Sequence, residues 1–486
     1  MSEILKLEPK QVWNYFHEIT RIPRPSKKEQ RIIEYMRDFG KKHNLETLVD
    51  EVGNVIIKKP ATKGMENKKG VILQSHLDMV PQKNSDKKHD FEKDPIETLI
   101  DGDWVKANGT TLGSDNGIGV AATMAVLASK DLQHGPLEAL FTIDEETGMT
   151  GVFGLKGGLL NGEILLNLDS EDEDELCVGC AGGIDVSATL DYNEEKAPNG
   201  YVAYKVYVKG LKGGHSGVDI ALGRANSNQL MAQFLMQAGS DFAIRLSEVS
   251  GGDLRNAIPR EASSVVLVED SKTKKFEEFV KRYDSVYKAE YSDTEPDLLF
   301  ACEKTTTPEK VMAKDAQFMI VRAVFVCPNG VVRMSQSISG LVETSNNLAI
   351  VKAKAGKFEA HCLTRSSVDT AKEATAWKIA AVFHLIRADV KLTGGYPGWK
   401  PNMQSPVLKV TSDVFKRLHG KEPGVKAIHA GLECGLIQGV YPGLDMISFG
   451  PTIKYPHSPD EKVHIPSVGR FWDFLVETLK NIPAKN

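Results

Sequence analysis

Several short apolar runs in this chain each end in a histidine or in acidic residues. Three of them are GVILQSHLDMV with His76 and Asp78, LEALFTIDEETG with Glu145 and Glu146, and EILLNLDSED with Asp169. Such runs predict buried strands of a parallel sheet. In open α/β sheets the chemistry gathers just outside the carboxyl ends of the strands. We therefore expect these side chains to meet at one edge of a sheet.

Helical periodicity surrounds these runs and completes an α/β pattern. We expect helices over residues 9–20, 27–43, 117–129, 405–418 and 467–480, with short strands near 46–50 and 54–59. Ser26 followed by Glu29 has the spacing of a capping box at the start of the second helix. The strands VKAIHAG and DMISFG bring the α/β pattern back near the carboxyl terminus.

The middle of the chain has a different pattern. VAYKVYVKG and KFEAHCLTR alternate apolar and polar residues, which predicts strands with one face in water. Charged helical stretches occur at 272–291 and 370–388, and the Gly/Pro-rich segment GGYPGWKP ends the region. We therefore predict an α/β domain formed by residues 1–183 and 401–486, interrupted by an inserted α+β domain over residues 184–400.

Composition narrows the class of protein. The 486 residues are 41% hydrophobic and 26% charged, with a net charge of −5, so we expect a globular protein without nucleic-acid or membrane partners. The start MSEILKLEPKQ lacks an export pattern, and no apolar run reaches the roughly 20 residues of a membrane span. Six cysteines do not make a disulfide framework. We expect a cytoplasmic location.

His76 and Asp78 suit a metal site. Residues i and i+2 of an extended chain point the same way. The histidine can bind a metal, and the carboxylate can fix the imidazole tautomer through a hydrogen bond. A pair that is simply satisfied at a strand end remains the alternative.

Glu145 and Glu146 are a sharper signal. Two adjacent carboxylates at a buried strand end repel each other and lose hydration. A divalent cation would relieve that cost, while one of the two carboxylates could act as a general base on water. An exposed acidic turn remains the alternative.

Asp115 lies in the Gly-rich segment TLGSDNGIG, directly before an expected helix. The glycines would suit a phosphate at a helix N-terminus, but the spacing is neither GxxxxGK[ST] nor GxGxxG. An aspartate here could instead bridge two metals. Asp169 opens the run DSEDEDE, whose other members we expect to be solvated. With His457 in GPTIKYPHSPDE as a second imidazole, the set matches a hydrolytic two-metal site.

Two further motifs are weaker on their own. His215 lies in GLKGGHSG and, taken alone, is typical of an exposed loop histidine. Cys177 and Cys180 form a lone CxxC without the second pair that a zinc knuckle requires.

Together and in this order, the motifs resemble those of the co-catalytic dizinc exopeptidases, the family that includes carnosinase, peptidase T and acetylornithine deacetylase. The resemblance runs from near residue 10 to the carboxyl terminus. It is carried by LDMVPQKN, GTTLGSDNGIG, GCAGGID, KGLKGGHSG, RNAIPRE, HAGLECGL and GPTIKYPHSPDE. It implies a zinc-exopeptidase-like α/β domain with a mixed, mostly parallel sheet, interrupted by an inserted α+β lid domain.

The resemblance also implies roles in the α/β domain. His76, Asp115 and Asp169 would bind one zinc, Asp115, Glu146 and His457 would bind the other, Glu145 would be the general base, and Asp78 would orient His76. Relatives often have a cis peptide bond after the bridging aspartate, so we expect one between Asp115 and Asn116.

In the lid domain we expect substrate contacts, and the resemblance implies the first of them. His215 would stabilise the oxyanion in the neighbouring subunit, which requires a homodimer through the lid. Arg365, in the strand-end motif HCLTRSS, could pair with the substrate carboxylate, since its planar guanidinium suits that bond. Asn256 in RNAIP is a further candidate for substrate binding.

These roles imply metal-dependent hydrolysis of dipeptides, including Xaa-His dipeptides such as β-Ala-His. The cofactors would be two divalent metal ions, expected to be zinc, with cobalt or manganese as substitutes. An aminotripeptidase or an N-acyl amino acid deacylase stays open, because all of these enzymes hydrolyse amides. A catalytically inactive binding protein is disfavoured, because every central residue is present. A requirement for a free amine would separate a dipeptidase from a deacylase.

Overall fold

The computed structural model describes residues 2–485, which divide into two compact units. Unit 1 takes in the chain up to Gly179, Pro401–Ala427 and the residues from Leu432 on, and unit 2 is Cys180–Lys400 with Ile428–Gly431. The sequence analysis placed the first boundary after residue 183. The segment ELCVGC forms β8 (Glu175–Cys180) in the sheet of unit 1, and β9 (Gly182–Asp191) directly after it already belongs to the sheet of unit 2, so the boundary falls a few residues earlier. No helix among the described residues is long and apolar enough to cross a membrane.

Unit 1 is built on an eight-stranded sheet with a parallel centre. Its order is β1 (Glu46–Val49), β2 (Val55–Lys59), β6 (Leu137–Thr142), β3 (Val71–His76), β7 (Ile164–Asn167), β23 (Asp445–Ser448), β8 and β22 (Gly424–Ile428). The four strands from β6 to β23 run parallel, whereas β1, β2 and β8 pair antiparallel. Every residue of β3, β6 and β7 is buried, which explains their continuous apolar sequences.

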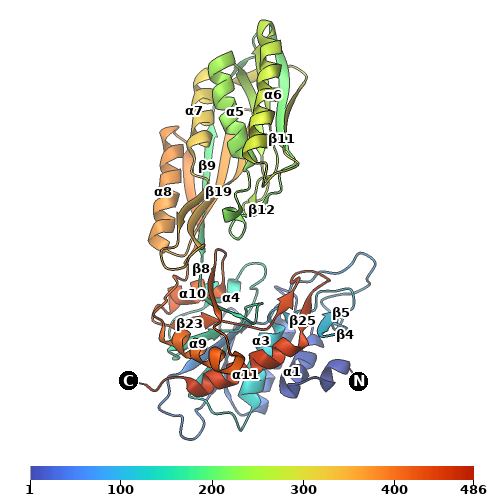
Figure 1. The fold of residues 1–486 in the computed structure, drawn as a ribbon, viewed down its shortest axis with the longest axis vertical. Helices are drawn as coiled ribbons and strands as arrows, with labels where there is room; N and C mark the ends of the chain where they lie inside the picture. Colours follow the sequence, from blue (N-terminus) through green and yellow to red (C-terminus); the bar gives the residue numbers. More distant parts are fainter. Residues whose placement is uncertain (1, 486) are drawn as a thin grey trace. The chain divides into compact units, whose positions relative to one another are not determined.

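Five helices of unit 1 lie within a few residues of the expected positions: α1 (Lys10–Thr20), α2 (Gln30–Lys42), α3 (Ser114–Ala128), α9 (Pro406–His419) and α11 (Ile465–Asn481). The described residues also form α4 (Thr150–Gly154) and α10 (Glu433–Val440). Almost every residue of α3 is buried, because its small side chains let it pack closely against α1, α11 and β3. Figure 1 shows α3 near α1 and α11. The short helices α4 and α10 were not expected.

The predicted capping box at the start of α2 is wrong. Glu29 is the N-cap residue, and no side chain caps the helix. Ser26 instead donates its hydroxyl to Asp78 Oδ2 at 2.7 Å. The Glu29 carboxylate accepts the backbone N–H of Lys27 at 2.8 Å and of Asp144 at 3.0 Å. Both residues therefore stabilise the segments near the strand ends rather than their own helix.

The acidic run DSEDEDE is also less solvated than expected. Glu173 pairs with Arg470 at 2.5 and 2.8 Å, and Asp174 pairs with Lys421 at 2.7 Å. These partners come from the carboxyl-terminal part of the chain, so the run fastens that part to the segment after β7.

Unit 2 consists of a largely antiparallel sheet and four long helices. Its strand order is β16 (Leu299–Lys304), β11 (Tyr201–Lys209), β15 (Ala262–Glu269), β13 (Arg245–Gly251), β19 (Val342–Lys354), β20 (Lys357–Ser366), β9 (Gly182–Asp191) and β21 (Asp389–Tyr396), with β18 (Gly330–Met334) beside β19. Figure 1 shows α5 (Ser227–Phe242), α6 (Thr273–Glu290), α7 (Lys314–Val326) and α8 (Asp369–Leu385) along these strands. α6 and α8 match the charged stretches of the sequence, whereas α5 and α7 were missed.

Candidate metal centre

The predicted ligands of unit 1 lie at the carboxyl ends of neighbouring strands. His76 is the last residue of β3, Glu145 and Glu146 follow β6, and Asp169 follows β7. Asp115 lies in the first turn of α3, and His457 lies between β24 (Ile453–Lys454) and β25 (Lys462–His464). Parallel pairing of β6, β3 and β7 aligns their ends, so the first four residues converge as expected.

One cluster is centred on the His76 imidazole. Its Nε2 atom lies 3.1 Å from Asp115 Oδ1 and 3.3 Å from Asp169 Oδ1. His76 is 1% exposed, so these carboxylates meet the ring away from bulk water. One imidazole nitrogen facing two carboxylate oxygens is the donor set of a divalent metal site.

A second cluster shares Asp115 with the first. His457 Nε2 lies 2.9 Å from Glu146 Oε2 and 3.3 Å from Asp115 Oδ2. The two oxygens of Asp115 therefore face different histidines, one in each cluster. This is the arrangement that a carboxylate bridging two cations requires. The peptide bond between Asp115 and Asn116 is cis, which confirms that prediction.

Asp78 organises the segment around both clusters. Its carboxylate lies 3.4 Å from His76 Nδ1, on the opposite side of the ring from the nitrogen that faces Asp115. It also accepts the backbone N–H groups of Glu145 at 3.0 Å and of Glu146 at 3.2 Å. Asp78 is fully buried, so one side chain fixes both the imidazole and the backbone that carries the glutamate pair.

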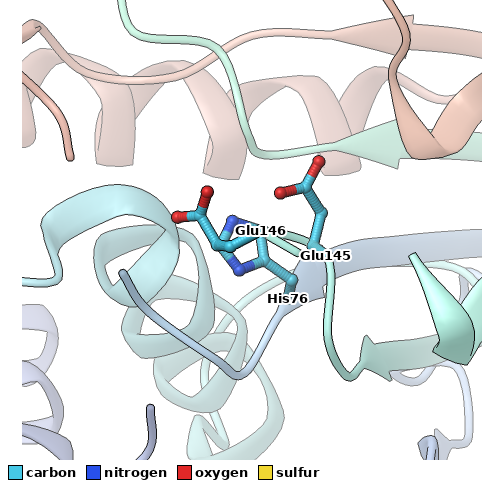
Figure 2. A group of neighbouring side chains, drawn as sticks. All are labelled: His76, Glu145 and Glu146. Carbon is cyan, nitrogen blue, oxygen red and sulfur yellow. The ribbon is translucent and has the colours of Figure 1, made fainter. Parts of the chain in front are cut away.

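Glu145 and Glu146 diverge from adjacent positions. Figure 2 shows the Glu146 carboxylate beside the His76 ring and the Glu145 carboxylate on its other side. Burial raises the pKa of Glu145 well above its usual value, and the charges of Asp169, Glu433 and Glu146 add to this effect. Of the two glutamates, Glu146 is the one that contacts His457, at 2.9 Å. Glu146 therefore belongs to the second cluster of candidate metal ligands, whereas Glu145 lies next to that cluster.

The pKa values of several groups in the two clusters are raised, which means that their protonated forms are favoured. Burial, with the charges of Asp115 and Glu146, raises the pKa of Asp169 to about 6. Hydrogen bonds to Asp115 and Glu146 raise the pKa of His457 to about 11. Against the effect of burial, neighbouring carboxylates also raise the pKa of His76. The crowded carboxylates therefore favour positive charge beside them, either as protons on these groups or as a cation.

The residues present fit two divalent cations. Asp169 Oδ1 and Glu146 Oε1 are buried and make no hydrogen bond within the described residues, although buried carboxylate oxygens normally have a partner. Both atoms belong to the clusters around Asp115. Imidazole nitrogens and carboxylate oxygens are ligands of zinc and of related divalent metals.

Arg24 supports the site and was missed by the sequence analysis. Its guanidinium is almost fully buried and donates to the backbone carbonyls of Leu77 at 2.8 Å, Asp78 at 2.9 Å and Gly113 at 2.5 Å. It therefore ties the turn after β3 to the turn before α3. Gly113 has a φ of 69°, and a Cβ there would lie 2.7 Å from Arg24 Nη2. The Gly-rich turn thus makes room for an arginine of the chain itself.

Glu433 is a second buried group that the sequence analysis did not assign. Its Oε2 atom accepts hydrogen bonds from Gln74 Nε2 at 2.6 Å and from Thr142 Oγ1 at 2.7 Å. Burial raises its pKa to about 8. Gln74 and Thr142 lie on β3 and β6, so Glu433 links α10 to the two strands that end at His76 and before Glu145. Glu433 lies in the motif HAGLECGL, which the sequence analysis used for the family resemblance without giving this glutamate a role.

The three predicted lid residues, His215, Arg365 and Asn256, all lie in unit 2. His215 is half-buried rather than exposed, and its Nδ1 atom accepts the backbone N–H groups of Gly217 at 3.2 Å and Val218 at 3.1 Å. This assigns the proton of the neutral ring to Nε2. Burial, together with the charge of Arg365, lowers the pKa of His215 and favours that neutral form.

Arg365 is buried at the end of β20 and meets only neutral partners among the described residues. Its Nη1 donates to Tyr396 Oη at 3.1 Å, and its Nε lies 3.5 Å from Ser216 Oγ. His429 is buried in the same unit, and burial followed by the charge of Arg365 lowers its pKa to about 3. A buried guanidinium without a carboxylate partner is suited to an anionic ligand.

Asn256 is exposed, next to the turn that carries His215. Its backbone carbonyl accepts the N–H of Ser216 at 2.9 Å, and β12 (Gly214–His215) pairs with β14 (Ala257–Ile258). The structure therefore brings His215, Arg365 and Asn256 into one region through contacts with Ser216.

Comparisons with known proteins show the family to which this chain belongs. The chain is 46% identical to cytosol non-specific dipeptidase of Escherichia coli (strain K12) over 485 residues, which covers 100% of both chains. The crystal structure of aminoacylhistidine dipeptidase from Vibrio alginolyticus superposes with a TM-score of 0.96 at 48% identity, covering 100% of this chain and 99% of that chain. Aminopeptidase PepT from Bacillus cereus shares the fold, with a TM-score of 0.57 at 15% identity over 98% of this chain and 99% of that chain. The model of peptidase family M20/M25/M40 matches residues 72–481, and the chain belongs to that family.

Proposed function

We propose that the protein is a metal-dependent dipeptidase that hydrolyses free dipeptides, including Xaa-His dipeptides such as β-Ala-His. The observation that carries the proposal is Asp115, whose two oxygens face one histidine each. Glu145 lies beside that pair without belonging to it. The names of the relatives from E. coli and V. alginolyticus support dipeptides as the substrate class. The name of the E. coli relative supports a cytosolic location.

His76, Asp115 and Asp169 would hold one cation, and Asp115, Glu146 and His457 the other. We propose zinc as the metal, with cobalt or manganese as substitutes, because the donors are imidazole nitrogens and carboxylate oxygens. When bound, two such cations polarise a carbonyl and make a water more acidic.

The reaction then depends on residues of this chain. Glu145 takes a proton from the attacking water and returns it to the departing amino group, since a buried carboxylate with a raised pKa is suited to both steps. Asp78 keeps the His76 ring oriented and holds the Glu145 backbone through its N–H. In unit 2, Arg365 is suited to bind the substrate carboxylate, with Asn256 as a further contact.

We expect the purified protein to contain two metal ions per chain and to hydrolyse dipeptides with a free amino group. A panel of β-Ala-His, α-dipeptides, a tripeptide and N-acetylated analogues, measured together with metal content, tests this expectation. A dipeptidase should leave the N-acetylated substrates intact. Preference for the tripeptide would identify an aminotripeptidase, and preference for N-acyl amino acids would identify a deacylase.

We propose further that the active form is a homodimer through unit 2, in which His215 serves the partner's site. The Nε2–H group of His215 can donate to the oxyanion, because Nδ1 already accepts two backbone N–H groups. His215→Ala should lower kcat about 100- to 1,000-fold, the typical cost of losing one oxyanion donor. His361→Ala, which removes another half-buried histidine of unit 2, should keep wild-type activity.

Subunit exchange tests the dimer. His215→Ala mixed with Glu145→Ala should regain about a quarter of wild-type activity after random exchange, because each heterodimer of a two-fold dimer has one complete site. Neither variant alone should be active. If exchange is demonstrated and the mixture stays inactive, His215 does not act on the partner's site.

A further inference from the structure

A single buried carboxylate holds the backbone that leads into Asp115. Glu461 is 2% exposed. Its Oε2 atom accepts the backbone N–H groups of Leu112 at 2.8 Å and of Gly113 at 3.0 Å. Its Oε1 atom accepts the N–H of Ser114 at 2.7 Å, the Ser114 hydroxyl at 2.6 Å and the N–H of Asp115 at 3.3 Å. Five donors from four consecutive residues therefore converge on one side chain.

This arrangement requires that both carboxylate oxygens of Glu461 accept hydrogen bonds. Backbone N–H groups can only donate hydrogen bonds, so both oxygens of Glu461 must act as acceptors to satisfy them. A glutamine in this position would offer only one acceptor oxygen and would bring an NH₂ group against donors. Hydrogen bonds from neutral donors to a buried carboxylate are stronger than neutral pairs, and an N–H left without a partner would be costly. The segment from Leu112 to Asp115 is thus fastened at every residue.

The other side of the same turn is fastened by Arg24. Its Nη2 atom donates to the carbonyl of Gly113, while Glu461 accepts the N–H of Gly113. The backbone before Asp115 is held through both its donors and an acceptor. Its position is therefore set by two side chains that come from sequence-distant parts of the chain.

Glu461 also belongs to the turn that presents His457. The N–H of Glu461 bonds to the carbonyl of Ser458 at 2.9 Å, which closes a tight turn directly after His457. The turn therefore delivers an imidazole to the cluster of Asp115 and Glu146 and fixes the backbone of Asp115 itself. Asp115 faces His76 through its other oxygen, so a shift of its backbone would disturb both clusters.

We propose that Glu461 is a positioning residue for Asp115, which it holds so that one carboxylate spans both metal positions and couples the binding of the two cations. The inference rests on the proposed two-metal function. It goes beyond that function because it assigns the coupling to a residue that would touch neither metal.

Glu138 provides a matched control. It is also a buried glutamate that fastens a loop, since its Oε2 accepts the N–H groups of Asn161 and Gly162, both at 2.8 Å. It lies near the start of β6, at the opposite end of the strand from Glu145. Glu138→Gln therefore removes the same kind of carboxylate without touching the residues around Asp115.

The test compares metal binding by the metal-free wild-type protein, Glu461→Gln and Glu138→Gln. Calorimetric titration with Zn²⁺ gives the affinities, and Co²⁺ absorption spectra report the geometry of the bound metal. We expect two cooperative sites in the wild type and in Glu138→Gln. Glu461→Gln should bind about 10- to 100-fold more weakly, the usual cost of losing a group that orients a ligand. It should also lose cooperativity and show an altered Co²⁺ spectrum.

A milder variant covers the case in which Glu461→Gln does not fold. Ser114→Ala removes one of the five donors and leaves the backbone intact, so it should shift metal affinity in the same direction by a smaller factor. Metal binding by Glu461→Gln or Ser114→Ala that matches Glu138→Gln would overturn the positioning role. A wild-type protein that binds fewer than two cations would instead overturn the proposed two-metal function.

Discussion

Replacing Glu145 by glutamine is expected to abolish turnover while both metal ions stay bound. Glu145 lies next to the ligand clusters, whereas Glu146 contacts His457 at 2.9 Å. Glutamine keeps the size of the side chain but cannot take a proton from water. Loss of a general base typically costs about 10²- to 10⁴-fold in rate. The measurement is kcat together with metal content on the same metal-replete sample.

Glu146→Gln is the matched control for this expectation. It removes a charged oxygen from the cluster of Asp115 and His457, so its main effect should be weaker metal binding. The two variants carry the same chemical change at adjacent positions of the chain. Equal metal retention in both would contradict the division of roles between the two glutamates, and near wild-type turnover by Glu145→Gln would exclude it as the base.

Removal of the metal ions should stop turnover completely, and re-addition should restore it. The two clusters hold three carboxylates and two imidazoles within contact distance, which is a donor set suited to divalent cations. Metal should also stabilise the fold, by about 2.7 kcal/mol at a free concentration 100 times the Kd. Activity and thermal unfolding should be measured on chelated and reloaded protein.

Low pH should weaken the same metal binding. Every ligand must lose its proton to bind a cation, so the affinity should fall as the pH drops through the range in which the imidazoles and carboxylates are protonated.

The chelation experiment also has an outcome that would contradict the proposal. Full activity after exhaustive chelation, with the metal content verified, would exclude a metal-dependent hydrolase.

The fold and the residues of the two clusters around Asp115 could be predicted because their signals are local. His76 and Asp169 directly follow apolar runs, and parallel strands align such positions without further information. Asp115 was found from the glycines around it, although their reason is the close approach of Arg24 rather than a phosphate. The same local rules did not locate α5 and α7 in the inserted region.

The supporting residues could not be predicted because their roles depend on distant parts of the chain. Glu461 binds a turn that lies about 350 residues earlier, and nothing in its own neighbourhood indicates this. Ser26 and Glu29 show the opposite case. Their spacing fits a helix cap, but Asp78 and Asp144 offer buried partners that compete with the helix end. Tertiary contacts therefore override the local signal around the site.

A fragment cut out at residues 180 and 400 would not be a self-sufficient piece of this protein. Ile428–Gly431 groups with that fragment although it lies beyond its carboxyl end in the sequence. The N–H of Ala181 bonds to the carbonyls of Ile428 at 3.1 Å and Ala430 at 2.9 Å, and Ser345 bonds to His429 at 2.7 Å. A transplanted or separately expressed version would need these four residues grafted back, so the insertion is not a removable module.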